Sequence, residues 1–273
     1  MNLTDVERAM ELKDSVGWNQ VEWDWKTFLN LNPELCYVAT VGDEVVGTTT
    51  AISFAGKVAW IGMVIVDEGH RGKGIGKLLM NRAIHDLDDH DTIKLDATAM
   101  GLPVYEKLGF RAERTFYRMI CKDGNLQQIH GGETLTAGPC FELLAAWDRK
   151  VLGYDRSLLL RSLVDKYGSL SGVVLSGEEV SGYLLGRAGS NFTQLGPLVA
   201  STVDNARRVT EGVLSSGLQG AIVVDVNSDK TGFIEWLRQL GFSKQREFVR
   251  MYLGDETSVK EELQYLIAGP EFG

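Results

Sequence analysis

Cysteine is scarce in this sequence, and its three copies, Cys36, Cys121 and Cys140, are scattered without C-x-x-C spacing. This pattern argues against a disulfide framework and against a structural zinc site, so we expect no metal. No apolar stretch approaches the roughly 18 residues of a membrane span, so we expect no membrane partner. Residues 1–14 are acidic and amphipathic, unlike a signal or transit peptide, and we expect a cytoplasmic protein.

Basic residues are also in deficit. The chain has 28 Lys and Arg against 37 Asp and Glu, for a net charge of -9. Such a surface repels nucleic acid and anionic lipid, so we expect neither as a partner. The charge weakly favours a cationic small molecule or a basic peptide. A length of 273 residues allows one large domain or two small ones.

One glycine-rich loop stands out in "VIVDEGHRGKGIGKLLM", residues 64–80. The run before it, residues 57–66, is β-branched and aromatic and has the length of a strand. Apolar residues at helical spacing follow over 79–87, and residues 92–98 alternate as a half-buried strand does. The loop therefore joins strand to helix within a β-α-β unit. Free N–H groups and the helix dipole at such a junction suit a phosphate or pyrophosphate.

Two nucleotide-binding motifs fail at this loop. A Walker A loop needs Ser or Thr after Gly76-Lys77, where this chain has Leu78. A G-x-G-x-x-G fingerprint that starts at Gly74 needs a glycine where the chain has Leu79. The pattern R-x-x-G-x-G fits residues 71–76. Further on, "PVYEKLGF" (103–110) predicts a short helix with Tyr105 four residues before a Gly-Phe pair.

With these motifs in this order, the chain resembles the GNAT superfamily of N-acetyltransferases. The resemblance implies a mixed α/β (α+β) fold, a mostly antiparallel sheet with flanking helices, and two strands that splay apart to hold acetyl-CoA. The backbone of Val64, Ile65 and Val66 would pair with the pantetheine arm. The pyrophosphate would be held by the loop, which comprises Arg71, Gly72, Lys73, Gly74, Ile75, Gly76 and Lys77.

The resemblance also assigns chemistry to Tyr105. Its hydroxyl would lie beside the sulfur of CoA and, with an ordinary pKa of about 10, would protonate the departing thiolate. Many members of the superfamily carry an Asn seven residues earlier, in contact with the pantetheine arm. This chain has Thr98 there, whose hydroxyl can still donate or accept a hydrogen bond.

The acceptor side is less defined by the sequence. Family topology places residues 17–28, which are rich in Trp, over the acceptor, so Trp18, Glu22 and Asp24 are the expected substrate contacts. Rings and carboxylates suit an amine, although the same residues could equally serve helix packing. Three kinds of general base stay open: a carboxylate, one of the histidines His70 and His85, or an ordered water molecule. Water is favoured because it fills this role more often than any particular side chain.

The second half of the chain repeats the first. "LGFRAERTFYRM" (108–119) and "LGFSKQREFVRM" (240–251) share seven of twelve positions at an offset of 132. We therefore expect two GNAT-like domains, 1–128 and 133–273, joined near 125–135. The second lacks the glycines, and Leu237 stands in place of Tyr105, so we expect it to have lost catalysis. Two roles stay open for it, a wall of the acceptor pocket or a homodimer interface.

The predicted activity is transfer of an acetyl group from acetyl-CoA to a primary amine of a small molecule or peptide. No cysteine is placed as a nucleophile, which favours direct attack in a ternary complex. Two alternatives stay open, a non-catalytic acyl-CoA sensor and an enzyme that uses a longer acyl chain.

Overall fold

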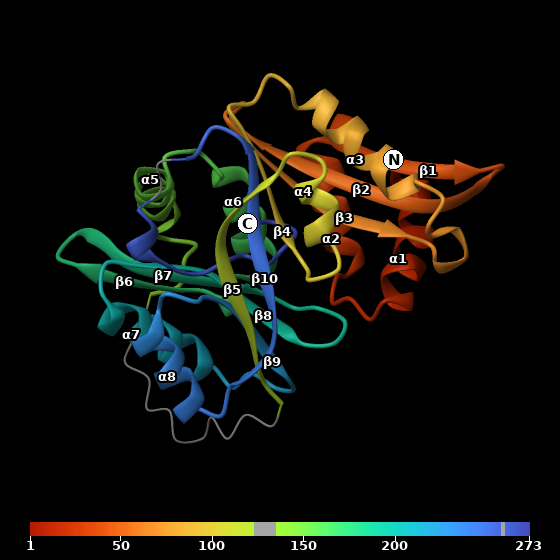
Figure 1. Ribbon diagram of the computed structural model, residues 1–273. Helices are drawn as coiled ribbons and strands as arrows, with labels where there is room; N and C mark the ends of the chain where they lie inside the picture. The colour runs from red at the N-terminus through yellow and green to blue at the C-terminus, as the bar shows by residue number, and fades with distance from the viewer. Residues whose placement is uncertain (123–134, 258–259) are drawn as a thin grey trace.

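The computed structural model describes residues 1–122, 135–257 and 260–273, so most of the predicted join between the halves lies outside the described residues. The strands form one sheet in the order β1-β2-β3-β4-β10-β5-β9-β11-β8-β7-β6 (Figure 1). Only the pairs β3–β4 and β8–β9 are parallel. The predicted mixed α/β fold with a mostly antiparallel sheet and flanking helices is confirmed. No helix among the described residues is long and apolar enough to cross a membrane.

The first half contains the β-α-β unit that the sequence predicts around the glycine loop. A meander of three antiparallel strands leads into this loop, and its first turn lies at Gly42, where a φ of +60° favours glycine. The elements are α1 (Val6–Ser15), α2 (Glu22–Leu31), β1 (Cys36–Val41), β2 (Glu44–Phe54), β3 (Val58–Val66), α3 (Ile75–Asp86), β4 (Thr92–Ala97), α4 (Leu102–Glu106) and β5 (Arg111–Cys121).

The second half follows the same order of elements and adds one short strand near its end. Its elements are α5 (Phe141–Leu152), α6 (Ser157–Tyr167), β6 (Gly172–Ser176), β7 (Glu179–Arg187), β8 (Thr193–Ala200), α7 (Val203–Leu214), β9 (Ile222–Asn227), α8 (Thr231–Gln239), β10 (Ser243–Gly254) and β11 (Gln264–Leu266).

The two halves exchange their repeated strands. β10 of the second half lies next to β4 of the first, and β5 of the first half lies next to β9 of the second. β5 and β10 also pair with each other, and Phe116 faces Phe248, its counterpart in the repeat. Figure 1 shows these two strands side by side at the centre of the molecule. Because both strands carry the motif L-G-F-x-x-x-R-x-F-x-R-M, each fits the position of the other.

Two buried ion pairs hold the exchanged strands. Arg118 of β5 donates two hydrogen bonds to Asp225 of β9, at 2.8 and 2.7 Å. Arg250 of β10 donates two to Asp96 of β4, both at 3.0 Å. The two arginines are repeat counterparts, and each neutralises a carboxylate of the opposite half. Bidentate pairing satisfies charges that would otherwise be costly to bury.

The helices of both halves also share a hydrophobic core. Trp25 and Phe28 of α2 lie in one buried cluster with Leu159 and Leu160 of α6. The Phe28 ring stacks on Phe272 near the end of the chain, with ring centroids 4.9 Å apart. The halves therefore depend on each other through packing as well as through the sheet.

Candidate active site

β3 and β4 diverge partway along their length, and a cavity opens between them. The two strands pair only over Val58–Trp60 and Thr92–Lys94. Beyond that point lies a cavity of about 120 Å³, lined by both strands, α4, β5, β10, residues 18–20 and residues 270–271. The predicted divergence of the two strands is confirmed, and residues of both halves line the space between them.

A bulge in β3 shapes the edge of this cavity. Met63 has a φ of +54°, and the pairing with β2 shifts register there. The hydroxyls of Thr48 and Thr50 donate to the carbonyls of Met63 and Gly62, at 2.7 and 3.4 Å, and so satisfy the distorted backbone. Residues 64–66 continue past the bulge. Because β2 pairs with only one edge of β3 and β4 has turned away, the other edge is open to an extended ligand.

The glycine loop leaves its backbone free. Gly72 and Gly74 have φ values of +75° and +83°, and no atom lies within 4 Å of a side-chain carbon built at either. No hydrogen bond within the described residues occupies the N–H groups of residues 72–77. Such a row of N–H groups at the start of α3 is the chemistry that a diphosphate needs, so the loop fits this group.

The basic side chains of the loop have different surroundings. The Nε of Arg71 donates to the Val66 carbonyl at 3.2 Å, and the Nζ of Lys73 donates to the Gly69 carbonyl at 2.9 Å. Lys77 is exposed in the first turn of α3. The first two therefore brace the loop, and their charges lie beside the open N–H groups.

Tyr105 lies on α4 and forms part of the cavity wall, as Thr98 does at the end of β4. Burial raises the pKa of the Tyr105 hydroxyl to about 12, so it keeps its proton at neutral pH. Gly101 leaves room for the ring, since a side-chain carbon there would lie 2.8 Å from Tyr105 Cε2. The Thr98 hydroxyl accepts a hydrogen bond from the Gly101 N–H at 3.3 Å. Thr98 thus helps to fix the turn that positions Tyr105.

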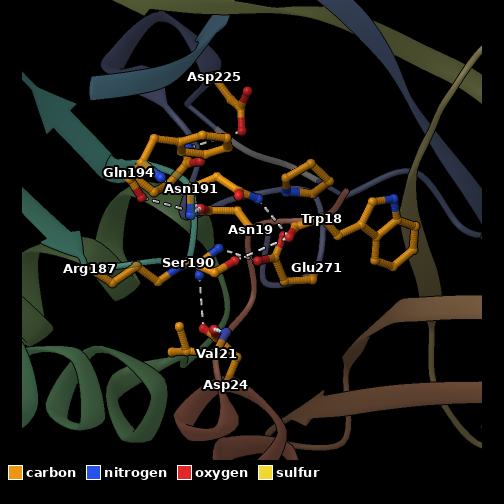
Figure 2. Close-up of polar contacts among 12 residues, drawn as sticks. Trp18, Asn19, Val21, Asp24, Arg187, Ser190, Asn191, Gln194, Asp225 and Glu271 are labelled. Atoms are coloured by element: carbon orange, nitrogen blue, oxygen red, sulfur yellow. Dashed lines mark hydrogen bonds and ion pairs between the residues drawn. The ribbon is translucent and has the colours of Figure 1, made fainter. Parts of the chain in front are cut away.

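The loop after α1 forms the opposite wall, and the second half of the chain holds it in place. Trp18 lines the cavity, and its predicted contact with the acceptor stays a prediction. Asn19 Oδ1 accepts from the N–H groups of Asn191 and Phe192, at 2.9 and 3.0 Å. Its Nδ2 donates to the Phe192 carbonyl at 3.1 Å. Figure 2 shows Asn19 between the residues of this turn. The turn between β7 and β8 therefore fixes the conformation of the loop at residues 18–20.

Glu22 and Asp24 lie outside the cavity lining. Glu22 is exposed and pairs with Lys26 at 2.7 Å. Asp24 is fully buried and accepts from Arg187 at 2.9 Å and from the Val21 N–H at 2.6 Å. Arg187 also pairs with Glu271, which does line the cavity (Figure 2). Asp24 therefore supports the site through Arg187.

Among the cavity-lining residues that escaped sequence analysis are Arg246, Phe248 and Glu271 of the second half. The first two belong to the repeated motif, so a signal for them was present, but only the strand exchange brings β10 to the cavity. Glu271 belongs to a short tail with no motif, and tertiary packing alone brings it beside Gly62.

A pH-dependent contribution to stability is expected from Asp24. Burial beside Glu271 raises the pKa of Asp24 to about 6 despite the opposing charge of Arg187, against 3.8 ordinarily. The folded protein therefore binds more protons than the unfolded chain between these values, and this contribution to stability falls as pH rises from 4 to 6. In Asp24→Asn, which keeps an oxygen for the Val21 N–H, this fall should be absent.

Urea unfolding of both proteins between pH 4 and 8 checks this expectation. The stability of the natural protein relative to Asp24→Asn should decrease with rising pH and level off above about 7. If the difference in stability between the two proteins stays constant or increases with pH, Asp24 is ionised in the folded protein throughout this range.

The second half offers no equivalent cavity within the described residues, because β11 occupies the space where its two parallel strands diverge. β8 and β9 pair over Thr193–Leu195 and Ile222–Val224, and β11 then pairs with both. A side-chain carbon at Gly196 would lie 1.9 Å from the Ile267 carbonyl oxygen, which shows how closely the tail approaches. Leu237, the counterpart of Tyr105, is fully buried in the core. The gap between β8 and β9 is thus filled by the chain itself.

Comparison with known proteins supports this structural description. Residues 5–110 match the model of the acetyltransferase (GNAT) family, and residues 144–266 match that of an acetyltransferase (GNAT) domain. The uncharacterized N-acetyltransferase YitH of Bacillus subtilis is 31% identical over 89% of this chain and 86% of its own. The holothin acyltransferase of a Pseudoalteromonas species is 27% identical over 94% of this chain and 87% of its own.

A solved structure has the same fold. A Pyrococcus horikoshii protein assigned as an acetyltransferase superimposes with a TM-score of 0.83 at 22% identity, covering 100% of this chain and 94% of its own. The fold and these matches define a two-domain acyltransferase, and residues of both halves line the cavity between β3 and β4. The chain belongs to the GNAT family of acetyltransferases.

Proposed function

We propose that this protein transfers an acetyl group from acetyl-CoA to a primary amine in a ternary complex. The observation that carries the proposal is one cavity that joins the free edge of β3, Tyr105 and an acceptor wall. The glycine loop at the start of α3 would hold the diphosphate, and residues 64–66 would pair with the pantetheine arm. This geometry brings a thioester and an amine together, which by itself accelerates their reaction.

The residues of the chain have separate tasks in this reaction. The amine nitrogen forms a bond to the carbonyl carbon, and the bond from that carbon to sulfur breaks. Tyr105 gives its proton to the departing sulfur, and the amine loses one proton to a carboxylate or to water. The products are an N-acetyl amine and free CoA, and Tyr105 regains its proton from solvent.

A non-catalytic acyl-CoA sensor is the alternative. A sensor needs the glycine loop but needs neither a proton donor beside the sulfur nor an acceptor wall. The protonated Tyr105 in the cavity wall, opposite the ordered loop at Trp18, favours the enzyme.

The substitution Gly74→Val tests the assignment of the loop. Valine at a φ of +83° is strained, and its side chain would enter the space that the diphosphate needs. We expect acetyl-CoA to bind about 10- to 100-fold more weakly, as measured by calorimetry, and CoA release with a panel of amines to fall accordingly.

Gly177→Val is the matched control. Gly177 has a φ of +64° in the exposed turn between β6 and β7, and no atom lies within 4 Å of a side-chain carbon built there. The backbone strain is therefore similar, but acetyl-CoA affinity should be unchanged. Equal affinities in Gly74→Val and the natural protein would refute the assignment of the loop.

A further inference from the structure

The cavity contains one charged side chain that the protein leaves without a charged partner. Asp96, Arg118 and Glu271 line the cavity and are each paired, with Arg250, Asp225 and Arg187 respectively. Arg246 also lines it, and no carboxylate among the described residues pairs with it. Its guanidinium carbon lies 5.0 Å from the centroid of the Phe248 ring, and the charges of Asp225 and Glu271 act on it without forming an ion pair.

Arg246 is exposed to solvent and also lines the cavity. Arg246 lies directly opposite Arg118 on the neighbouring antiparallel strand. Like charges in this register repel each other, and Asp225 already neutralises Arg118 through a bidentate pair. An anion bound in the cavity would relieve the repulsion that Arg246 experiences.

On the other side of the cavity, carboxylates outnumber arginines. Asp24 and Glu271 share a single arginine, Arg187. The Oε1 of Glu271 accepts from Arg187, and no hydrogen bond among the described residues occupies Oε2. Glu271 and Arg246 line the same cavity and form no ion pair with each other within the described structure. The cavity therefore presents a carboxylate oxygen and a guanidinium that are both available to a ligand.

We propose that the acceptor is an amine that also carries a carboxylate, with Arg246 binding the carboxylate and Glu271 binding the ammonium. Trp18, Met63 and Phe248 supply apolar walls between them, so an apolar amino acid is the simplest such acceptor. This inference rests on the proposed function and narrows its acceptor class. The net charge of -9 weakly favours cationic acceptors, but the groups that face the cavity determine which acceptor is recognised.

The test compares matched acceptors in the presence of acetyl-CoA. Phenylalanine, leucine and methionine are each paired with their carboxamide, which keeps the amine and the side chain but lacks the charge, and spermidine represents cationic acceptors. CoA release by the natural protein should give a kcat/KM at least about 10-fold higher for the acids than for the amides or spermidine.

Variants then assign the effect to Arg246. Arg246→Gln should raise KM for the acids about 10- to 100-fold and leave the amides within about 2-fold, and Arg246→Lys should restore part of the loss. Glu271→Gln should weaken acids and amides alike, because both carry the ammonium. Lys244→Gln removes the same charge two residues away, outside the cavity lining, and should change neither.

Two results would overturn the inference. The first is that the amides or spermidine are used as well as the acids. The second is that Arg246→Gln affects acids and amides equally. Either result would exclude Arg246 from acceptor recognition and leave the proposed N-acetyl transfer intact. The absence of CoA release with every amine would overturn both this inference and the proposed function.

Discussion

Tyr105→Phe is expected to lower kcat at least about 100-fold while the affinity for acetyl-CoA stays unchanged. The ring keeps its place beside Phe110 and in the cavity wall, so binding should be preserved. Only the hydroxyl is lost, and with it the proton for the departing sulfur. Because burial raises the pKa of Tyr105 to about 12, the hydroxyl is protonated throughout the neutral range. Steady-state CoA release and calorimetry with acetyl-CoA measure the two quantities separately.

Tyr37→Phe serves as the matched control. Tyr37 lies on β1, outside the cavity lining, and its hydroxyl donates to Asp86 at 3.0 Å. Its loss should leave kcat unchanged and cost at most about 1 kcal/mol of stability. If Tyr105→Phe kept a kcat within about 3-fold of the natural protein, another group or water would have to supply the proton.

Asp225→Ala is expected to lower the free energy of unfolding by about 3–5 kcal/mol. The substitution leaves the guanidinium of Arg118 buried without its carboxylate, and Gln194 loses its hydrogen bond to the same group. The pair joins β5 of the first half to β9 of the second, so its loss weakens the exchange itself. Urea unfolding monitored by circular dichroism gives the value.

An exposed pair provides the comparison. Glu235 and Arg238 form an ion pair on α8, with side chains that are 60% and 55% exposed. Glu235→Ala should therefore cost less than about 1 kcal/mol. A loss of the same small size in Asp225→Ala would mean that water reaches Arg118 once the carboxylate is gone. Replacing both partners, as Arg118→Met with Asp225→Leu, should recover much of the stability, because no buried charge is left unpaired.

The second half of the chain contributes directly to the site in the first. The turn at residues 190–192 fixes the loop at Asn19, and Arg246 and Glu271 line the cavity. Of the two roles that the sequence left open for this half, a wall of the acceptor pocket is the one that these cavity-lining residues fit, and it stays a proposal. The homodimer stays a prediction.

The sequence by itself determined the parts of this protein that depend on local order. The glycines at 72 and 74, the helix that follows them and the position of Tyr105 are close together in the chain, so their spacing predicted a β-α-β unit. The resemblance that these motifs carry implied the gap between its two strands. The repeat at 108–119 and 240–251 likewise predicted two related halves. These features need only backbone conformation and periodicity, which short stretches of sequence encode.

Tertiary structure alone decided which half receives each repeated strand and which residues of the second half line the cavity. The two copies of the motif are alike enough that either strand fits either position. No local signal in the sequence therefore shows whether the two halves exchange these strands. The pairs Arg118–Asp225 and Arg250–Asp96 show the outcome. Asp24 and Glu271 follow the same principle, because long-range packing around Arg187 buries both carboxylates and leaves only Glu271 in the cavity lining. Contacts between residues far apart in the chain depend on the whole fold, and the stretches that contain them do not encode these contacts.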